Sequence, residues 1–276
     1  MPKLTVELYQ SLHDALEARS AETGEPVAHI VTRALSEALG LDHATLFQVS
    51  TTGALVQGVY RGAMTLGRLK EHGDFGLGTF DGLDGEMVAL DGEFYQVHSS
   101  GKIEKPADGA LVPFAVVTNF RPARRAEVPA FTSLAELTAG LDALRRSDNL
   151  FFAVRIDGAF ASMRTRAACR AGEGVPLVAA TAHQAEFTFD NARGTIVGFW
   201  SPPYARSLNV TGWHLHFLTD DRKGGGHVLD CSGGPLEAAV QDLDDVRLAI
   251  PETREFLEAD LTKDPTAALN IAEKCR

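Results

Sequence analysis

The segment Trp213-His214-Leu215-His216-Phe217-Leu218 determines the fold of the C-terminal half of the chain. Its alternation of apolar and polar residues predicts a strand with both histidines on one face, because successive side chains of a strand point to opposite sides. After a Gly-rich loop the chain enters a second apolar segment at His227. A hairpin that places His227 opposite residue 216 or 218 brings all three imidazoles to the same face. Three neutral imidazoles with an open fourth position are typical of a catalytic zinc site.

Two other interpretations of these histidines stay open at this point. A pair of histidines on a strand can form an ordinary polar face, although a third histidine beyond the loop favours a metal site. Cupin barrels also combine His-x-His with a later histidine and a carboxylate, and Asp220 follows His216 at roughly the cupin spacing. The other histidines lie outside this pattern and are expected to be structural or exposed: His13, His29, His43, His72, His98 and His183.

The composition is that of a globular chain with a substantial core. The 276 residues are 45% hydrophobic and 23% charged, and 26 basic against 37 acidic residues give a formal charge of −11. A net acidic chain lacks the basic surface that nucleic-acid binders normally carry. No segment approaches the roughly eighteen apolar residues of a membrane span, and the N-terminus does not resemble a signal peptide. We therefore expect a cytoplasmic protein without nucleic-acid or membrane partners.

Residues 1–43 differ in pattern from the rest of the chain and resemble a ribbon-helix-helix module. Lys3–Leu8 alternates polar and apolar residues as a short strand does. Two helical segments follow, one between Ser11 and Gly24 and one that ends at Gly40. A unit of this size cannot bury a sufficient core of its own and usually pairs with a second copy.

A ribbon-helix-helix module that reads DNA inserts the outward side chains of its strand into the major groove. Here those side chains belong to Lys3, Thr5 and Glu7, and residues 1–43 carry three basic against seven acidic residues. The segment is therefore predicted to be a dimerisation extension. A metal-binding regulator with a DNA-binding N-terminus is the alternative to an enzyme.

From residue 44 to residue 276 the sequence is rich in candidate strands with helices set between them. This pattern predicts an α/β (mixed α+β) fold without strict βαβ alternation. Two helices are expected, Thr65–Lys70 and Ser133–Arg146, the second of which opens with a capping box between Ser133 and Glu136. The expected strands are Glu93–His98, Leu111–Phe120, Leu150–Ile156, Ala159–Arg166, Ala185–Phe189, Thr195–Trp200, Trp213–Leu218, Val228–Cys231 and Val246–Ile250.

Several motifs in this region resemble those of the α-acetolactate decarboxylase family. They include Leu83-Asp84-Gly85-Glu86-Met87 and the block from Trp213 to Leu229, in matching order and spacing. The resemblance begins at about Thr45 and continues to the C-terminus. It implies two strand-rich halves with mixed and antiparallel sheets, about 44–148 and 149–276, with zinc held by the second half at their interface.

The resemblance also implies site residues of two kinds, metal ligands and catalytic groups. The sequence departs from the family pattern after Arg166, where the usual proline is missing and one residue fewer precedes Gly194. The implied zinc ligands are His214, His216, His227 and Glu273, and the implied catalytic groups are Thr79, Glu86, Arg166 and Glu273.

The implied reaction is the conversion of 2-acetolactate to (R)-acetoin and CO₂ by a homodimeric carboxy-lyase that uses Zn²⁺. Loss of CO₂ from a β-keto acid leaves an electron pair that moves into the adjacent ketone as an enediolate, which a cation stabilises. The rigid donor fork of Arg166 suits a carboxylate or an enediolate oxygen. Glu86, beside the metal, is suited to deliver the proton that completes acetoin.

Overall fold

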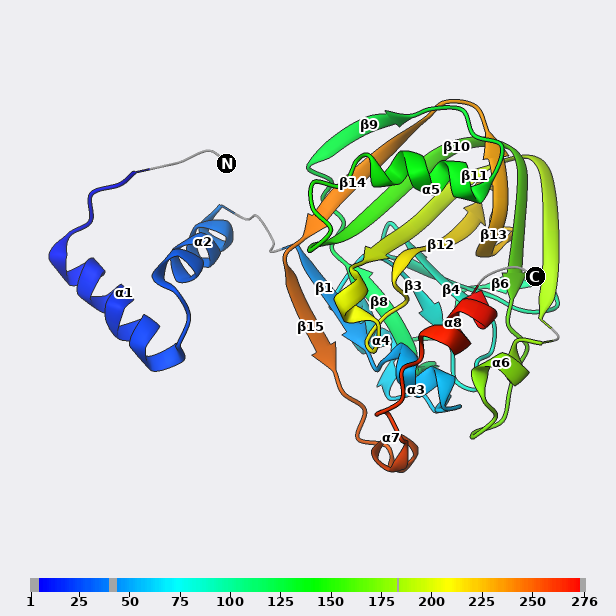
Figure 1. Cartoon of the computed structure of the whole chain (residues 1–276), viewed down its shortest axis with the longest axis horizontal. Helices are drawn as coiled ribbons and strands as arrows, with labels where there is room; N and C mark the ends of the chain where they lie inside the picture. The colour runs from blue at the N-terminus through cyan, green and yellow to red at the C-terminus, as the bar shows by residue number, and fades with distance from the viewer. Residues whose placement is uncertain (1–4, 40–43, 183, 274–276) are drawn as a thin grey trace. The chain divides into compact units, whose positions relative to one another are not determined.

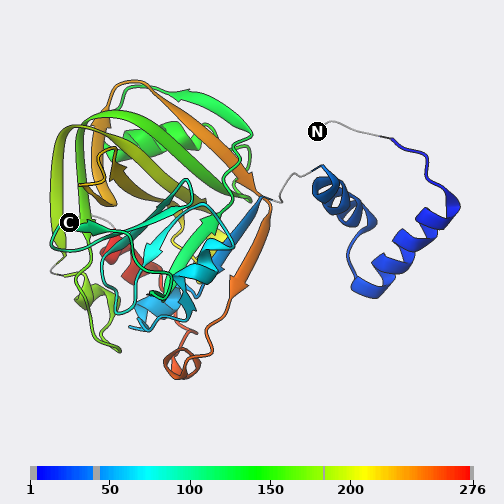
Figure 2. The same ribbon diagram turned by 180° about the vertical axis from the view of Figure 1, so that it is seen from behind.

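The computed structural model describes residues 5–39, 44–182 and 184–273, and the chain divides into two compact units, Met1–His43 and Ala44–Arg276. Figure 1 labels the elements of both units, and Figure 2 shows the same ribbon from behind. Among the described residues, no helix has both the length and the apolar character that a membrane crossing requires.

The N-terminal unit contains two helices, α1 (Gln10–Thr23) and α2 (Val27–Ala38). Helix α1 begins one residue before the expected cap at Ser11. It ends at Gly24, whose φ of +73° is left-handed and whose N–H donates to the Ser20 carbonyl at 2.8 Å. Both helices expected from the sequence are therefore present.

The strand expected over Lys3–Leu8 is not formed by residues 5–8, the part of it that the structure describes. A strand needs a neighbour that completes its hydrogen bonds, and the described residues of this unit provide none. Ile30 is the one buried apolar side chain described in this unit. Its exposed large apolar side chains are Val6, Leu8, Tyr9, Leu12, Leu35 and Leu39.

The first sheet of the larger unit has seven strands, β1 (Thr45–Val49), β3 (Phe75–Thr79), β4 (Glu86–Leu90), β5 (Glu93–Val97), β6 (Ile103–Glu104), β8 (Phe114–Thr118) and β15 (Asp245–Ala249). Their order is β15-β1-β8-β3-β4-β5-β6. All neighbours are antiparallel except β15 and β1, which are parallel. A separate ribbon pairs β2 (Met64–Thr65) with β7 (Leu111–Val112).

The second sheet has six strands, β9 (Arg124–Val128), β10 (Phe151–Ala167), β11 (Ala185–Ser201), β12 (Gly212–Thr219), β13 (Gly225–Gly233) and β14 (Leu236–Leu243). Their order is β11-β12-β13-β10-β14-β9, and every pairing is antiparallel. Because β10 also pairs with β11, the four strands β10 to β13 close into a ring.

Short helices flank the two sheets. They are α3 (Thr52–Val56), α4 (Leu66–Lys70), α5 (Leu134–Asp142), α6 (Leu177–Ala180), α7 (Arg254–Glu258) and α8 (Thr266–Glu273), with a 3₁₀ turn at Pro203–Ala205. As expected, the Ser133 hydroxyl caps α5 by accepting the Glu136 N–H at 3.3 Å. The helix ends four residues before the expected Arg146.

The main apolar core lies between the two sheets. It combines Leu77 and Val88 of the first sheet with Ala153, Val197 and Leu218 of the second. A second cluster packs Leu137 and Leu141 of α5 against strands of the ring. This packing brings β4 of the first sheet close to β12 and β13 of the second.

Two differences from the expected elements have physical causes. Strands β3 and β4 were missed because both their faces are buried, so their side chains do not alternate in polarity. The two strands expected around Gly158 form the single strand β10. Gly158 is not a turn residue there: a Cβ at this position would lie 2.4 Å from Leu236 Cδ2, so the glycine permits close packing.

The expected division between residues 148 and 149 does not coincide with the two sheets. Strand β9, which precedes the boundary, belongs to the second sheet, whereas β15, which follows it, returns to the first. Each sheet therefore contains one edge strand from the other part of the chain, because strand pairing depends on position in space and not on sequence order.

Gly226 provides a test of the hairpin that carries the histidines. Its φ is +128°, and a Cβ at this position would lie 2.3 Å from the Arg166 carbonyl oxygen. We expect Gly226→Ala to lower the free energy of unfolding by about 2–3 kcal/mol, measured by urea denaturation. Gly92→Ala is the matched control, because Gly92 also has a positive φ, +80°, but no atom within 4 Å of the added Cβ. Equal losses in the two variants would contradict the close approach.

Candidate active site

Three histidines meet on one face of the β12–β13 hairpin. His216 pairs directly with His227 across the two strands, which confirms one of the two registers expected from the sequence. The side chains of His214, His216 and His227 are buried, and one ring nitrogen from each lies within 4.8 Å of the other two. On the opposite face, Leu215 and Phe217 pack into the core. The alternation in the sequence therefore predicted correctly that the three imidazoles lie on the same face.

Each of these imidazoles has a buried nitrogen without a hydrogen-bond partner. His216 Nδ1 donates to the Met87 carbonyl at 2.7 Å, which leaves Nε2 as the unpartnered nitrogen. In His214 and His227 the unpartnered nitrogen is Nδ1. Buried polar atoms without a partner are uncommon and often indicate an ion at the site. The donor set of three imidazoles suits zinc.

Burial keeps these histidines neutral, which is the form that binds a metal. It lowers the pKa of His216 to about 3, and the nearby charge of Arg166 acts in the same direction. Burial also lowers the pKa values of His214 and His227 far below the ordinary range. Neither proton nor solvent therefore competes strongly for these nitrogens at neutral pH.

Arg166 lies between two carboxylates that come from distant parts of the chain. On β10 it pairs in register with His227, so its guanidinium is close to the histidines. Nη1 donates to Glu86 Oε1 at 3.1 Å, and Nη2 donates to Glu273 Oε2 at 3.0 Å. Its Nε is buried without a hydrogen-bond partner. Arg155, an earlier arginine of β10, is not part of this cluster and pairs with Asp91.

Glu86 directly follows Gly85 and is the first residue of β4. Its Oε1 also accepts the Ala168 N–H at 3.2 Å, and its Oε2 is 3.6 Å from His216 Nε2. Burial raises the pKa of Glu86 to about 7, while the charge of Arg166 opposes this shift and that of Glu273 adds to it. A carboxyl group with such a pKa can both hold and release a proton near neutral pH.

Glu273 is at the C-terminal end of α8 and reaches the histidines as expected. Its Oε2 is 3.3 Å from His227 Nε2 and 3.9 Å from His214 Nε2. Thr79 lies on β3 directly opposite Glu86 in the strand register. Its hydroxyl donates to the Gly85 carbonyl at 2.7 Å. The structure thus brings together all the site residues expected from the sequence.

The residues of the alternative assignments lie away from this cluster. Asp220, the carboxylate of the cupin interpretation, is exposed and 3.7 Å from Arg193, so it is not part of the cluster. His72 stacks on Phe47 with ring centroids 3.7 Å apart. His98 lies between Asp84 and Glu104. His13 and His29 are exposed, and His43 and His183 fall outside the described residues.

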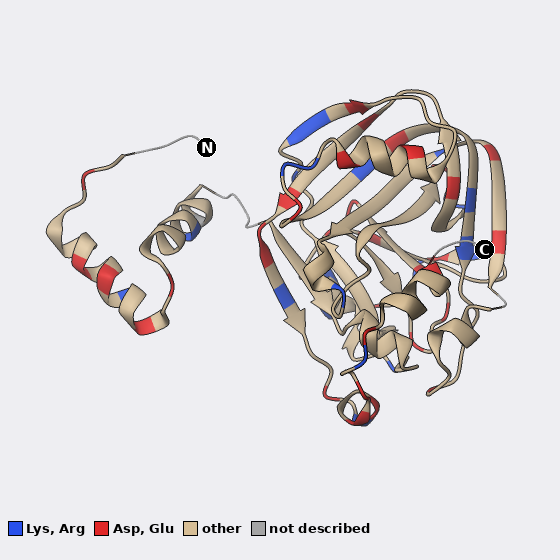
Figure 3. Cartoon of the chain, in the orientation of Figure 1, with Lys and Arg blue, Asp and Glu red and all other residues tan. Residues whose placement is uncertain are grey.

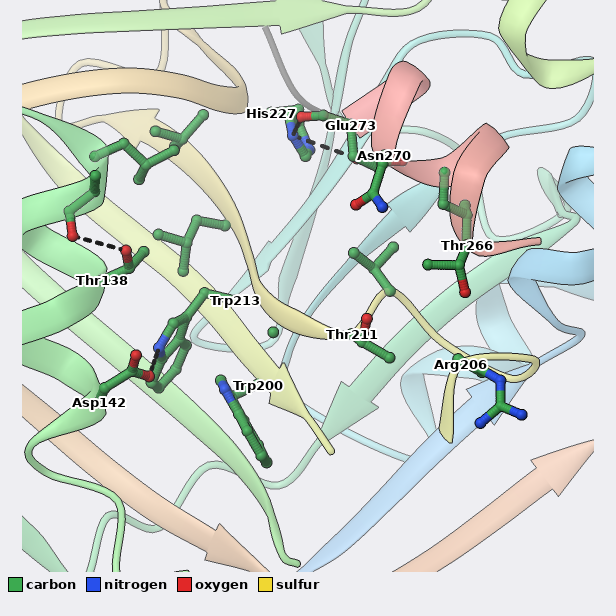
Figure 4. Close-up of a pocket in the computed structure, with 17 residues that line it drawn as sticks. Thr138, Asp142, Trp200, Arg206, Thr211, Trp213, His227, Thr266, Asn270 and Glu273 are labelled. Carbon is green, nitrogen blue, oxygen red and sulfur yellow. Dashed lines mark hydrogen bonds and ion pairs between the residues drawn. The ribbon is translucent and has the colours of Figure 1, made fainter. Parts of the chain in front are cut away.

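Two cavities adjoin the cluster. The first, called here the reaction chamber, has a volume of about 40 Å³ and is lined by Thr79, Glu86, Arg166, His214 and Glu273 together with apolar side chains. The second, called here the vestibule, has a volume of about 420 Å³. Figure 4 shows His227 and Glu273 on one side of the vestibule and Trp213 on the other, where its indole N–H donates a hydrogen bond to Asp142.

Sequence reasoning missed the apolar part of the reaction chamber. Its wall includes Leu55, Leu83, Phe114, Leu177 and Leu269, which come from five separate elements or loops. Only Leu269 had a local signal, because it precedes Glu273 by four residues and therefore lies on the same face of a helix. The other four are ordinary apolar residues until the chain is folded.

Comparison with known proteins identifies the relatives of this chain. The family model for alpha-acetolactate decarboxylase matches residues 46–263. The alpha-acetolactate decarboxylase of Methanosarcina mazei is 42% identical over 231 residues, covering 83% of this chain and 80% of the relative. That of Methylococcus capsulatus is 42% identical over 239 residues, covering 85% and 91%.

A solved structure shows the same relationship. The crystal structure of alpha-acetolactate decarboxylase from Bacillus subtilis strain 168 superposes with a TM-score of 0.81 at 36% sequence identity. The match covers 84% of this chain and 100% of the Bacillus chain. Together, the sequence match over residues 46–263 and the shared fold show that the chain belongs to the alpha-acetolactate decarboxylase family.

Proposed function

We propose that this chain decarboxylates 2-acetolactate to (R)-acetoin and CO₂ with a zinc ion held by His214, His216 and His227. The observation that carries the proposal is the convergence of three buried imidazoles beside the Arg166 guanidinium and its two carboxylates. Relatives that carry the name alpha-acetolactate decarboxylase support the same reaction.

Glu273 is proposed as a further zinc ligand. Its Oε2 lies beside both His227 and His214, and a carboxylate oxygen is a common partner of imidazole at zinc sites. A zinc ion bound by this set would supply Lewis-acid stabilisation of the negative charge that develops on the substrate oxygens.

Arg166 is proposed to orient the substrate. Its Nε is buried and unpartnered, which leaves a charge-assisted donor for a carboxylate or an enediolate oxygen. When the C–C bond to the carboxylate breaks, its electron pair moves into the adjacent ketone and CO₂ departs. The guanidinium is positioned to stabilise this anionic product of bond cleavage without any rearrangement of water.

Glu86 is proposed to donate the proton that completes acetoin. Its carboxyl group lines the reaction chamber and is buried, so the proton is delivered within an enclosed space to one face of the enediolate. Each turnover consumes one proton, which Glu86 must regain before the next cycle. Thr79 is proposed to hold the turn before β4 in place through its bond to Gly85, which fixes the position of the Glu86 carboxyl group.

Residues 1–43 are proposed to form a dimerisation extension. Most large apolar side chains described in this unit are exposed, and the unit lies outside the matched residues 46–263. Acidic side chains predominate on α1, as Figure 3 shows, which disfavours contact with a phosphate backbone. A second copy would complete the missing strand pair and cover the apolar side chains.

Removal of the metal should abolish decarboxylation. We expect the purified protein to release acetoin from racemic 2-acetolactate, to lose this activity after treatment with a chelator, and to regain it when zinc is added. Acetoin is measured colorimetrically and zinc by elemental analysis of the same samples. Full activity in protein shown to be free of metal would contradict the zinc proposal, and no acetoin from zinc-loaded protein would contradict the reaction.

Glu86→Gln tests the proton donor. The amide can still accept hydrogen bonds from Arg166 and Ala168 but cannot supply the proton, so we expect kcat to fall by at least about 100-fold. Zinc content and the unfolding midpoint should stay close to those of the parent. Glu93→Gln, which changes an exposed glutamate on β5, is the matched control. Activity equal to that control would exclude Glu86 as the donor.

Deletion of residues 1–43 tests the extension. The Bacillus chain is covered completely by a match to 84% of this chain, so the remaining residues correspond to a fold that forms without the extension. We expect the truncated protein to keep decarboxylase activity but to have a lower oligomeric state by light scattering than the full chain. The same oligomeric state and the same thermal stability in both proteins would refute the proposal.

A further inference from the structure

The reaction chamber and the vestibule are separated by a thin partition. Of the residues that the structure describes, three line both cavities: Val210, Leu269 and Glu273. Glu273 supplies the polar part of the partition through its contacts with Arg166 and His227. Val210 and Leu269 supply its apolar part. Their side chains therefore determine where the chamber ends and the vestibule begins.

Val210 belongs to a loop that is fixed to the first sheet. The Val210 N–H donates to Asn209 Oδ1 at 2.8 Å, and Asn209 Nδ2 donates to Gln48 Oε1 at 3.0 Å. Gln48 Nε2 in turn donates to the Leu208 carbonyl at 2.7 Å. Asn209 and Gln48 are both buried, so this network holds the loop firmly. This side of the partition has little freedom to adjust.

Leu269 closes the other side from helix α8. It is 6% exposed and packs in the main core cluster with Leu55, Leu83, Phe114 and Leu177, the other large apolar residues of the chamber wall. Those four residues line the chamber but not the vestibule. Leu269 and Val210 are thus the apolar residues of the chamber wall that have the second cavity behind them, and Leu269 is the larger of the two.

The reaction chamber has a polar wall and an apolar wall, which suit different parts of the substrate. Charged and polar groups converge at Arg166, Glu86 and His214, so the alkyl groups of a 2-hydroxy-3-oxo acid face the apolar wall. A volume of about 40 Å³ accommodates only a few water molecules. Any lengthening of an alkyl group must therefore be accommodated by the displacement or removal of a wall residue.

We propose that Leu269 limits the length of the alkyl group that the enzyme accepts on its 2-hydroxy-2-alkyl-3-oxo acid substrate, an inference that rests on the proposed function. Shortening Leu269 connects the chamber with space that already exists in the vestibule. Shortening Leu55, Leu83, Phe114 or Leu177, which do not line the vestibule, leaves an enclosed void instead. The vestibule also offers apolar surface to an alkyl group that enters it, because Trp200, Trp213 and Leu215 are among the residues that line it.

The experiment compares two substrates in three variants of one residue. The substrates are 2-acetolactate and the homologue that carries an ethyl group in place of the methyl group at C2. For Leu269→Ala we expect the ratio of kcat/KM for the homologue to that for 2-acetolactate to rise by about tenfold or more. Leu269→Val should give a smaller rise, and Leu269→Phe should lower the ratio below that of the parent.

Ile271→Ala is the matched control, because it shortens an exposed aliphatic side chain on the same helix and should leave the ratio unchanged. Zinc content and the unfolding midpoint of every variant establish that α8 remains in place. An unchanged ratio in all three Leu269 variants, or an equal fall on both substrates in all three, would overturn the proposal. Failure of the parent protein to decarboxylate 2-acetolactate would instead refute the proposed function.

Discussion

The structure of the larger unit depends on the neutralisation of one buried positive charge. The Arg166 side chain is 4% exposed, and its guanidinium is held by Glu86 and Glu273. A buried guanidinium without partners would be strongly destabilising, whereas good geometry with both carboxylates offsets the loss of hydration. These partners come from β4 of the first sheet and from α8, while Arg166 lies on β10 of the second sheet. The charge therefore requires three distant segments to meet.

The three histidines of the cluster are also buried, but unlike Arg166 they are uncharged. Burial keeps them neutral, and three of their nitrogens lack any hydrogen-bond partner. Buried nitrogens without partners cost stability, and the proposed function gives a reason for their presence. The proposed zinc ion would bind one nitrogen of each imidazole, and the raised pKa of Glu86 follows from the same burial. Stability and chemistry at this site thus have one physical origin, the exclusion of water between the two sheets.

The two units of the chain differ in how much of their apolar surface is buried. The larger unit buries its apolar residues between two sheets and under α5, and it corresponds to the complete fold of its solved relative. The N-terminal unit has Ile30 as the one buried apolar side chain among its described residues. The family fold is complete without this unit, which supports the proposal that the unit serves association.

The sequence by itself determined what depends on local periodicity. The alternation in residues 213–218 placed the histidines on one face of a strand, and the Gly-rich loop brought His227 opposite His216, because side chains of a strand alternate at every residue. The capping box at Ser133 likewise marked the start of α5.

The meeting of Glu86, Arg166 and Glu273 had no such local signal, and their place in the site followed from family resemblance alone. Residues 80 and 107 positions apart approach each other only when the two sheets pack and α8 docks. The strand position of Glu86, the pairing of β15 with the first sheet and the partition at Leu269 were likewise decided by tertiary structure. The reason is that buried charges and cavity walls are formed by contacts between segments, whereas the sequence specifies directly only the pattern within each segment.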